Sequence, residues 1–208
     1  MARGRLCVTG SDVLVIGDSL VKYLGGTGSA LDVVSLPGEG VDSVSRWLAE
    51  NFDARYKLVI VHVGTNDLSR EGASVLELYD KLCALRDLLP SGIHICISYL
   101  FGRCLSNLPN CWYNLSKTKL VRFNSNVLEL NALLSRSGIS ILEHGRGFAV
   151  DRKLYGGDGL HLSRSGVSSF SMEIARYVQQ WRVSICLKSF TFVTSQTFVG
   201  LRLFFLVR

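Results

Sequence analysis

The stretch Val13-Leu14-Val15-Ile16-Gly17-Asp18-Ser19-Leu20 decides the fold class of this chain of 208 residues. Its first four residues form an unbroken apolar run rich in β-branched side chains, which is typical of a strand buried on both faces of a parallel sheet. The run ends in Gly17, Asp18 and Ser19, so a serine follows the carboxyl end of the strand. Open α/β sheets hold their functional groups at that edge. The stretch therefore predicts an α/β fold with Ser19 at its functional edge.

Apolar runs and helical patterns alternate along the rest of the chain. Four further runs predict strands over residues 31–36, 58–63, 93–99 and 139–142. Apolar residues recur at helical spacing in residues 41–51, 75–89, 112–135 and 165–181. This alternation predicts a three-layer α/β/α sandwich with about five parallel strands and right-handed crossovers.

The chain length suits one domain, which we expect over residues 1–182. Residues 183–208 break the alternation, because phenylalanines stand among threonines with few turn signals. This tail is interpreted as an edge hairpin, a docking segment, or sequence that was never selected to fold. Its longest uncharged span, residues 189–201, is shorter than the roughly 20 residues that a bilayer-spanning helix needs, so no transmembrane segment is predicted.

The composition excludes a largely disordered chain, since 48% of residues are hydrophobic, 19% are charged and only 3 are prolines. The net charge of +6 leaves nucleic acid open as a partner, but no predicted helix carries a basic run. The 6 cysteines form no CxxC pair, which indicates reduced thiols. With no recognisable signal peptide, we expect an intracellular, cytoplasmic chain or a piece of a longer protein.

Ester hydrolysis needs a nucleophile, a base, a group that orients the base, and donors for the developing oxyanion. Ser19 is the candidate nucleophile, although Asp18 or Ser19 could instead cap the following helix. Asp158 precedes His161 by three residues in a glycine-containing loop, so its carboxylate could reach the near imidazole nitrogen. The alternative is a local turn with an exposed histidine.

Donors for an oxyanion come from two other strand ends. The strand of residues 58–63 delivers Asn66 to the same sheet edge, and its amide group can donate where an aspartate cannot. Gly38 follows the second strand and offers a backbone N–H with no side chain in the way. Turn chemistry alone could explain either residue. His62 and His94 are expected to be packed, whereas His144 follows a strand end and is a second candidate for a site role.

Four ordered motifs resemble those of the SGNH hydrolases, also called GDSL esterases. They are Gly17-Asp18-Ser19-Leu20, Gly38, Gly64-Thr65-Asn66-Asp67 and Asp158-Gly159-Leu160-His161. The resemblance spans about residues 11–182. It implies a flavodoxin-like sandwich and a serine esterase in which Ser19 is acylated, His161 acts as base and then acid, and Asp158 orients His161.

The resemblance further implies an oxyanion hole formed by the backbone N–H groups of Ser19 and Gly38 and the side chain of Asn66. It implies that Asp18 and Asp67 hold their loops through hydrogen bonds. The chain has no GxSxG, GxxxxGK[ST] or HExxH motif, so neither a cofactor nor a metal is predicted. The expected substrate is a carboxylic ester, such as an acetylated sugar or a lipid.

The amino-acid sequences of two motifs are similar to those of SGNH domains found beside LINE-type retrotransposon proteins in animal genomes. These motifs are Val61-His62-Val63-Gly64-Thr65-Asn66-Asp67-Leu68 and Asp158-Gly159-Leu160-His161-Leu162-Ser163. That resemblance implies one domain of a mobile-element protein. The alternative function is therefore a non-catalytic binding module that keeps the SGNH fold and holds an acylated or nucleic-acid partner.

Overall fold

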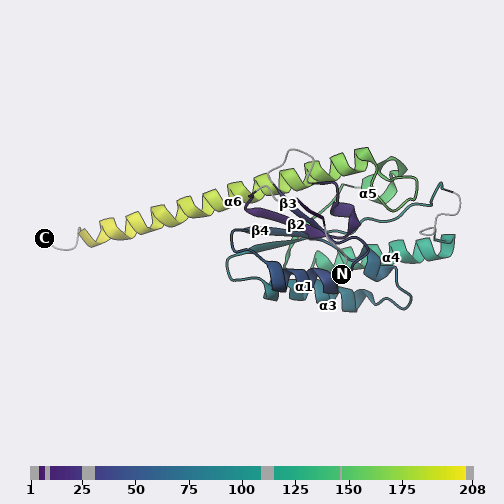
Figure 1. Cartoon of the computed structure of the whole chain (residues 1–208). Helices are drawn as coiled ribbons and strands as arrows, with labels where there is room; N and C mark the ends of the chain where they lie inside the picture. The colour runs from purple at the N-terminus through teal and green to yellow at the C-terminus, as the bar shows by residue number, and fades with distance from the viewer. Residues whose placement is uncertain (1–4, 8–9, 25–30, 109–114, 146, 205–208) are drawn as a thin grey trace.

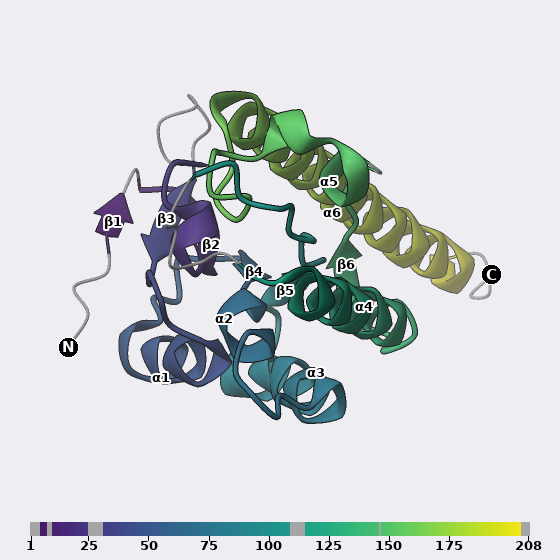
Figure 2. The ribbon, with the colours of Figure 1, turned by 90° about the vertical axis from the view of Figure 1, so that its right-hand side faces the viewer.

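A six-stranded sheet forms the centre of the molecule in the computed structural model, which describes residues 5–7, 10–24, 31–108, 115–145 and 147–204. Its strands lie in the order β1-β3-β2-β4-β5-β6 (Figure 2). All neighbouring pairs are parallel except β1 with β3. The strands are β1 Arg5–Cys7, β2 Val13–Gly17, β3 Asp32–Ser35, β4 Leu58–His62, β5 His94–Ser98 and β6 Ser140–Leu142.

Helices cover both faces of this sheet (Figures 1 and 2). One layer holds α1, α3 and α4, and the opposite layer holds α5 and α6. The α-helices are α1 Val41–Asn51, α2 Thr65–Leu68, α3 Val75–Ala84, α4 Lys117–Leu134, α5 Gly147–Val150 and α6 Arg164–Phe204. Short 3₁₀ helices are η1 Ser19–Val21, η3 Leu85–Leu88 and η4 Arg152–Leu154.

Alternation within the strands explains why their apolar runs are unbroken. Leu14 and Ile16 of β2 face the cluster that includes α1, α3 and α4, while Val13 and Val15 face the cluster that includes α6. All four side chains are 0% exposed. Successive side chains of a strand point to opposite faces, so a strand covered on both faces must be apolar at every position.

The parallel pairing brings the candidate motifs to one edge. Gly17 at the end of β2 lies opposite His62 at the end of β4, and the Asp18 backbone N–H donates to the His62 carbonyl over 3.3 Å. A Cβ on Gly17 would collide with that carbonyl, so only glycine permits this approach. The loops carrying Ser19 and Asn66 therefore leave neighbouring strands at the same edge.

The predicted α/β sandwich with five parallel strands is confirmed, and the sequence did not predict the sixth strand, β1, which pairs antiparallel at the edge. The helix predicted over residues 112–135 is observed from Lys117, and residues 112–114 lie outside the described chain. The helix predicted over residues 75–89 is α3 followed by the 3₁₀ turn η3. The thiols of Cys83, Cys96, Cys104 and Cys186 are free.

The tail continues helix α6 as far as Phe204, well past the end of the sheet (Figure 1). The edge-hairpin interpretation of residues 183–208 is therefore wrong over the described backbone, and residues 205–208 lie outside it. A helix that is already nucleated extends at little cost where no proline or capping motif stops it. A domain boundary at residue 182 stays a prediction. Among the described residues, no helix combines the length and apolarity needed to cross a membrane.

Candidate active site

Ser19 lies directly after β2, where the chain turns from the sheet into η1. Asp18 caps this short helix, because its Oδ1 accepts a 2.9 Å hydrogen bond from the Leu20 backbone N–H. Of the two residues that could cap this helix, Asp18 is the one that does so. The Ser19 hydroxyl instead faces His161, with 3.1 Å between Ser19 Oγ and His161 Nε2.

Asp158 and His161 share the loop between η4 and α6. The loop folds back on itself, because the Gly156 backbone N–H donates to the His161 carbonyl over 2.7 Å. Asp158 Oδ1 accepts hydrogen bonds of 3.0 Å from the backbone N–H groups of Leu160 and His161. Its other oxygen, Oδ2, lies 2.6 Å from His161 Nδ1. The short spacing of the two residues therefore produces a direct contact between carboxylate and ring.

The hydrogen bonds around Asp158 favour its ionised form and determine which nitrogen of the partner ring carries the hydrogen in the contact. Partial burial opposes ionisation, but the bonds from the His161 ring and from two backbone N–H groups outweigh it and lower the pKa of Asp158. An ionised carboxylate only accepts, so His161 Nδ1 carries a hydrogen. In the neutral ring, the Nε2 lone pair then faces the Ser19 hydroxyl. The His161 side chain remains 34% exposed, so the pair is open to solvent.

Asn66 and Gly38 lie close together at the same edge. Asn66 is the second residue of α2, and its Nδ2 donates a 2.8 Å hydrogen bond to the Glu39 carbonyl. An amide nitrogen carries two hydrogens, so one N–H of Asn66 remains for another acceptor. Gly38 has a φ of +80°, which favours glycine, and no atom lies within 4 Å of where its Cβ would be. Both candidates therefore keep donor groups near an open surface.

Asp67 and Asp18 hold the loops of this edge, as the motif resemblance implied. Asp67 Oδ2 accepts from the Val41 backbone N–H over 3.1 Å, which ties α2 to the start of α1. Gly40 lies so close to Asp67 that any side chain there would collide with its carboxylate. Asp18 is 1% exposed, and burial raises its pKa to about 7. Asp18 Oδ2 has no hydrogen-bond partner among the described residues.

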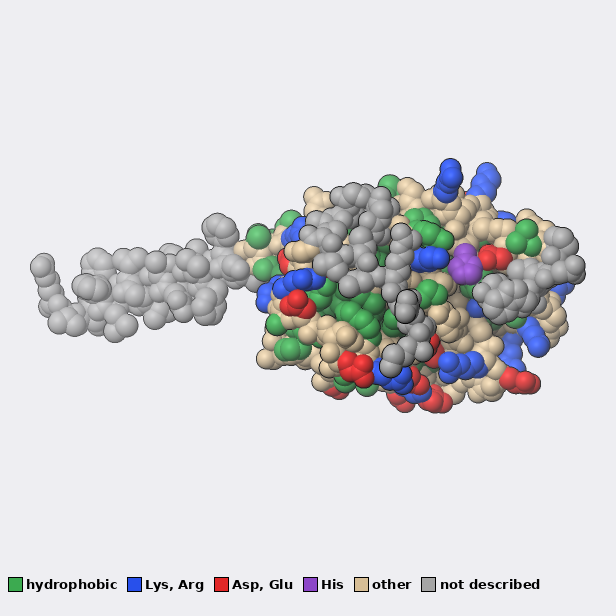
Figure 3. All heavy atoms as spheres, in the orientation of Figure 1, with side chains coloured by type: hydrophobic (Ala, Val, Ile, Leu, Met, Phe, Trp, Pro, Cys, Tyr) green, Lys and Arg blue, Asp and Glu red, His purple; other side chains and the backbone are tan. Residues whose placement is uncertain are grey.

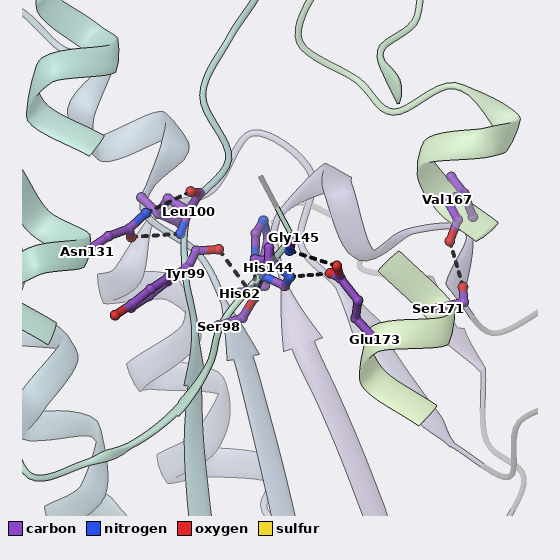
Figure 4. Close-up of polar contacts among 10 residues, drawn as sticks. All are labelled: His62, Ser98, Tyr99, Leu100, Asn131, His144, Gly145, Val167, Ser171 and Glu173. Atoms are coloured by element: carbon purple, nitrogen blue, oxygen red, sulfur yellow. Dashed lines mark hydrogen bonds and ion pairs between the residues drawn. The ribbon is translucent and has the colours of Figure 1, made fainter. Parts of the chain in front are cut away.

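The structure contains a second serine–histidine–carboxylate arrangement, which was not predicted from the sequence (Figure 4). Ser98 lies at the end of β5, and its Oγ is 2.7 Å from His144 Nε2. His144 Nδ1 lies 2.6 Å from Glu173 Oε2 on α6. His62 Nδ1 approaches Ser98 Oγ to 2.8 Å from the other side. These residues come from four separate elements, so no sequence spacing could have identified them.

Burial separates this arrangement from the first. Ser98 is 1% exposed, His62 is fully buried, and the His144 side chain is 4% exposed. Burial, followed by the nearby His144 ring, lowers the pKa of His62 well below its usual value, so His62 is neutral. A cavity of about 260 Å³ reaches His144 but not Ser98. His144, the second histidine candidate, thus contributes to a buried network, and the Ser98 hydroxyl has no open approach.

The remaining histidine prediction also holds. His94 Nε2 lies 3.1 Å from the hydroxyl of Tyr177 on α6, so His94 is packed between the sheet and that helix. Within the described chain, no group of three or more His, Cys, Asp or Glu side chains is arranged to hold a metal ion. The candidate site consists of side chains from the two loops and the turn that carry the motifs.

The fold is similar to that of solved ester-hydrolase structures, although no protein-family model and no curated protein matches the sequence. A GDSL-like lipase from Bacteroides thetaiotaomicron superposes with a TM-score of 0.63 at 14% identity, over 81% of this chain and 87% of that one. A carbohydrate acetylesterase from Sinorhizobium meliloti gives 0.60 at 18% identity, over 81% and 98%.

An inhibitor-bound aryl esterase from M. smegmatis is similar to the same extent, with a TM-score of 0.60 at 16% identity over 81% of this chain and 98% of that chain. These structures share the layered sheet and cover most of both chains. At such low identity they establish architecture rather than activity. The chain has the fold of the GDSL-like lipases and acylhydrolases.

Proposed function

We propose that this protein is a serine esterase that hydrolyses carboxylic esters through an acyl-enzyme. The observation that carries the proposal is the continuous contact from Ser19 through His161 to Asp158, which joins two loops separated by 142 residues. Nucleophile, base and orienting acid in hydrogen-bond reach are the arrangement that activates a serine. The folds of an aryl esterase and a carbohydrate acetylesterase support the same reaction class.

In the first step, Ser19 Oγ attacks the ester carbonyl while His161 Nε2 takes the hydroxyl proton. The distance of 3.1 Å between these atoms suits that transfer without a bridging water. Asp158 holds the ring in the correct tautomer and stabilises the imidazolium that forms. It remains ionised throughout, in keeping with its lowered pKa.

Charge develops on the carbonyl oxygen during this step, and three donors are proposed to stabilise it. They are the backbone N–H groups of Ser19 and Gly38 and the free N–H of the Asn66 side chain. The hydrogen bond from Asn66 to the Glu39 carbonyl supports this role, because it fixes the amide beside the turn that carries Gly38. Donors held in place before the reaction stabilise an oxyanion more than mobile water does.

The tetrahedral intermediate then collapses and releases the alcohol, which receives its proton from His161. The acyl group stays on Ser19 Oγ until a water molecule, deprotonated by His161, attacks the same carbonyl. This second tetrahedral intermediate collapses with cleavage of the bond between Ser19 Oγ and the acyl carbon, the carboxylic acid leaves, and His161 returns the proton to Ser19 Oγ. His161 thus acts as base and then acid in each half of the cycle. The partial exposure of His161 supports this sequence, because leaving alcohol and incoming water both need access to Nε2.

The decisive experiment is hydrolysis of p-nitrophenyl acetate by the purified chain and its Ser19→Ala variant. Hydrolysis that disappears in Ser19→Ala supports the esterase. A folded wild-type chain with no activity toward p-nitrophenyl esters from acetate upward would contradict it and favour the non-catalytic binding module. That the chain is one domain of a mobile-element protein is inferred from the sequences of two motifs and stays a prediction.

A further inference from the structure

Arg103 is a buried cation that forms no ion pair with a carboxylate of the described residues. The residue is only 9% exposed, and its Nη2 donates a 2.7 Å hydrogen bond to Ser69 Oγ. Its guanidinium carbon lies 4.4 Å from the centre of the Phe123 ring, while its Nε has no hydrogen-bond partner among the described residues. A buried charge is costly unless an opposite charge compensates it. Arg103 therefore lacks a close counter-ion.

The position of Arg103 connects it to the proposed active site. The next residue, Cys104, donates its backbone N–H to the Gly159 carbonyl over 2.9 Å, within the loop that carries Asp158 and His161. Ser69, which accepts from Arg103, follows Asn66 by three residues. Burial lowers the pKa of Arg103, while Asp18 and Asp158 partly oppose this through space without contacting the guanidinium. Arg103 thus lies between the two loops that would hold a substrate.

A small cleft of about 130 Å³ lies between the α2–α3 connection and the first half of α4. Ser69 and Phe123 line it, and they are the two residues that contact Arg103. Three exposed cations line it as well: Arg70, Lys119 and Arg122. Among the described residues, none of these three forms an ion pair.

Cations outnumber acidic residues among the side chains that line this cleft. Lys, Arg, Asp and Glu side chains are interspersed over the face shown in Figure 3. The cleft has one acidic residue, Glu71, against three cations, with a fourth cation buried behind its wall. Positive charge concentrated in a partly enclosed cleft attracts anions and raises their local concentration. Arginine in particular suits carboxylate and phosphate oxygens, because its guanidinium donates in a fixed fork.

We propose that Arg103 and the cleft of Arg70, Lys119 and Arg122 form an anion-binding subsite that selects esters carrying a second, negatively charged group. The inference rests on the proposed esterase activity and specifies its substrate class. A carboxylate or phosphate on the acyl or alcohol half would neutralise the cations while the ester carbonyl lies at Ser19. Arg103, which lies behind Ser69 and Phe123, then adds to the positive potential of the cleft, and the substrate anion compensates the cations that line it.

Two matched ester pairs test the subsite, and the members of each pair differ by one negative charge and one methyl group. One pair is the mono-4-nitrophenyl ester of adipic acid and its methyl ester; the other is 4-acetoxybenzoate and its methyl ester. We expect the wild-type chain to prefer the anionic member of at least one pair by about tenfold in kcat/KM. The preference should shrink at about 0.5 M salt, because salt screens partly exposed charges.

Three variants make the result specific. Arg103→Met should lower the anionic-to-neutral ratio about tenfold, and it should still fold because an apolar side chain replaces an uncompensated buried charge. Arg70→Ala/Arg122→Ala changes only exposed residues and should lower the ratio about threefold. Arg46→Ala, an exposed arginine on α1, removes the same charge elsewhere and should leave the ratio unchanged.

The outcomes separate the two proposals. Wild-type hydrolysis of the neutral esters that Ser19→Ala abolishes would uphold the esterase whatever the charge preference. A ratio near one in both pairs, or a ratio that survives both subsite variants, would overturn the anion-binding subsite alone. Absence of hydrolysis of all four esters by a folded chain would overturn the esterase and the subsite together.

Discussion

Two serine–histidine–carboxylate arrangements lie at the same edge of the sheet, and their hydrogen bonds are nearly alike. Ser19 and His161 are 3.1 Å apart, and Ser98 and His144 are 2.7 Å apart. The bond from each histidine to its carboxylate is 2.6 Å. The first arrangement is open, with a histidine that is 34% exposed, whereas the histidine of the second is 4% exposed.

The difference teaches that contact geometry alone does not define a site. Ser98 Oγ is held by a second ring, His62, in addition to His144, and the rings of Phe101 and Phe170 surround His62. An ester cannot reach Ser98 without displacing that packing. Among the described residues, the Ser19 side chain has one side-chain partner, His161, and Ser19 lies at the same sheet edge as the turn of Gly38 and the amide of Asn66. Access and nearby donors, rather than the triad pattern, therefore distinguish the reactive candidate.

The largest expected effect is the contrast between the two serines. Ser19→Ala should lower kcat for p-nitrophenyl acetate by about 10⁵-fold, because the nucleophile is removed. Ser98→Ala should leave kcat within about threefold, because a residue that does not contact the reacting atoms affects kcat only through the structure. Far-UV circular dichroism checks that both variants fold. Equal losses in the two folded variants would remove the distinction between the arrangements.

The next effect compares the two carboxylates. Asp158→Asn should lower kcat by about 10³- to 10⁴-fold, less than Ser19→Ala, because Asp158 orients and stabilises His161 without contacting substrate. Glu173→Gln should leave kcat within about threefold at neutral pH. An Asp158→Asn variant with wild-type kcat would show that His161 needs no orienting group. A loss as large as that of Ser19→Ala would instead indicate collapse of the loop.

A smaller effect tests the oxyanion donor proposed for Asn66. Asn66→Ala should lower kcat by about 10²- to 10³-fold with little change in KM, because the oxyanion forms only after attack begins. Asn51→Ala is the matched control, since Asn51 also donates its side-chain N–H to a backbone carbonyl, that of Trp47, on the surface of α1. A raised KM with unchanged kcat would assign Asn66 to substrate binding instead.

The smallest effect concerns stability and tests the structural role of the buried network. Hydrogen bonds from His144 and the Gly145 N–H outweigh partial burial and lower the pKa of Glu173. A lowered carboxyl pKa contributes stability above the unfolded-state pKa, and that stability is lost as the pH falls through the folded-state pKa. Glu173→Gln should therefore cost about 2 kcal/mol in urea unfolding near pH 7.

That cost should shrink in acid, as the pH falls through the lowered pKa of Glu173 and its carboxylate becomes protonated in the wild-type chain. A pH-independent difference between wild type and Glu173→Gln would show that the carboxylate charge contributes nothing to the network. Asp87→Asn is a suitable control, because Asp87 is exposed and makes only a 3.9 Å ion pair with Arg86.

Much of the fold and of the proposed site could be predicted from the sequence, because the signals are local. The apolar run before Ser19 identifies a strand buried on both faces, and parallel strands bring Ser19 and Asn66 to one edge. Asp158 and His161 are three residues apart in one turn, so spacing alone places the carboxylate within reach of the ring. The strand β1 is too short, at three residues, to give a periodic pattern.

Features that depend on tertiary packing could not be predicted from the sequence. Ser98, His144 and Glu173 come from β5, the segment after β6 and α6, and only the tertiary fold brings them together. The basic residues appear scattered along the chain, yet Arg70 and Arg122 line one cleft. The length of α6 was also missed, because phenylalanine and threonine favour strands, while continuation of an existing helix overrides that preference.

The most direct test of the central claim is covalent labelling with a fluorophosphonate, followed by peptide mapping in a mass spectrometer. Such a probe reacts with a serine that is both activated and accessible, so it separates the two arrangements in one measurement. We predict one label per chain, on Ser19 and never on Ser98, and no label in the Ser19→Ala variant. A folded wild-type chain that carries no label on Ser19, or carries it on Ser98, would contradict the account.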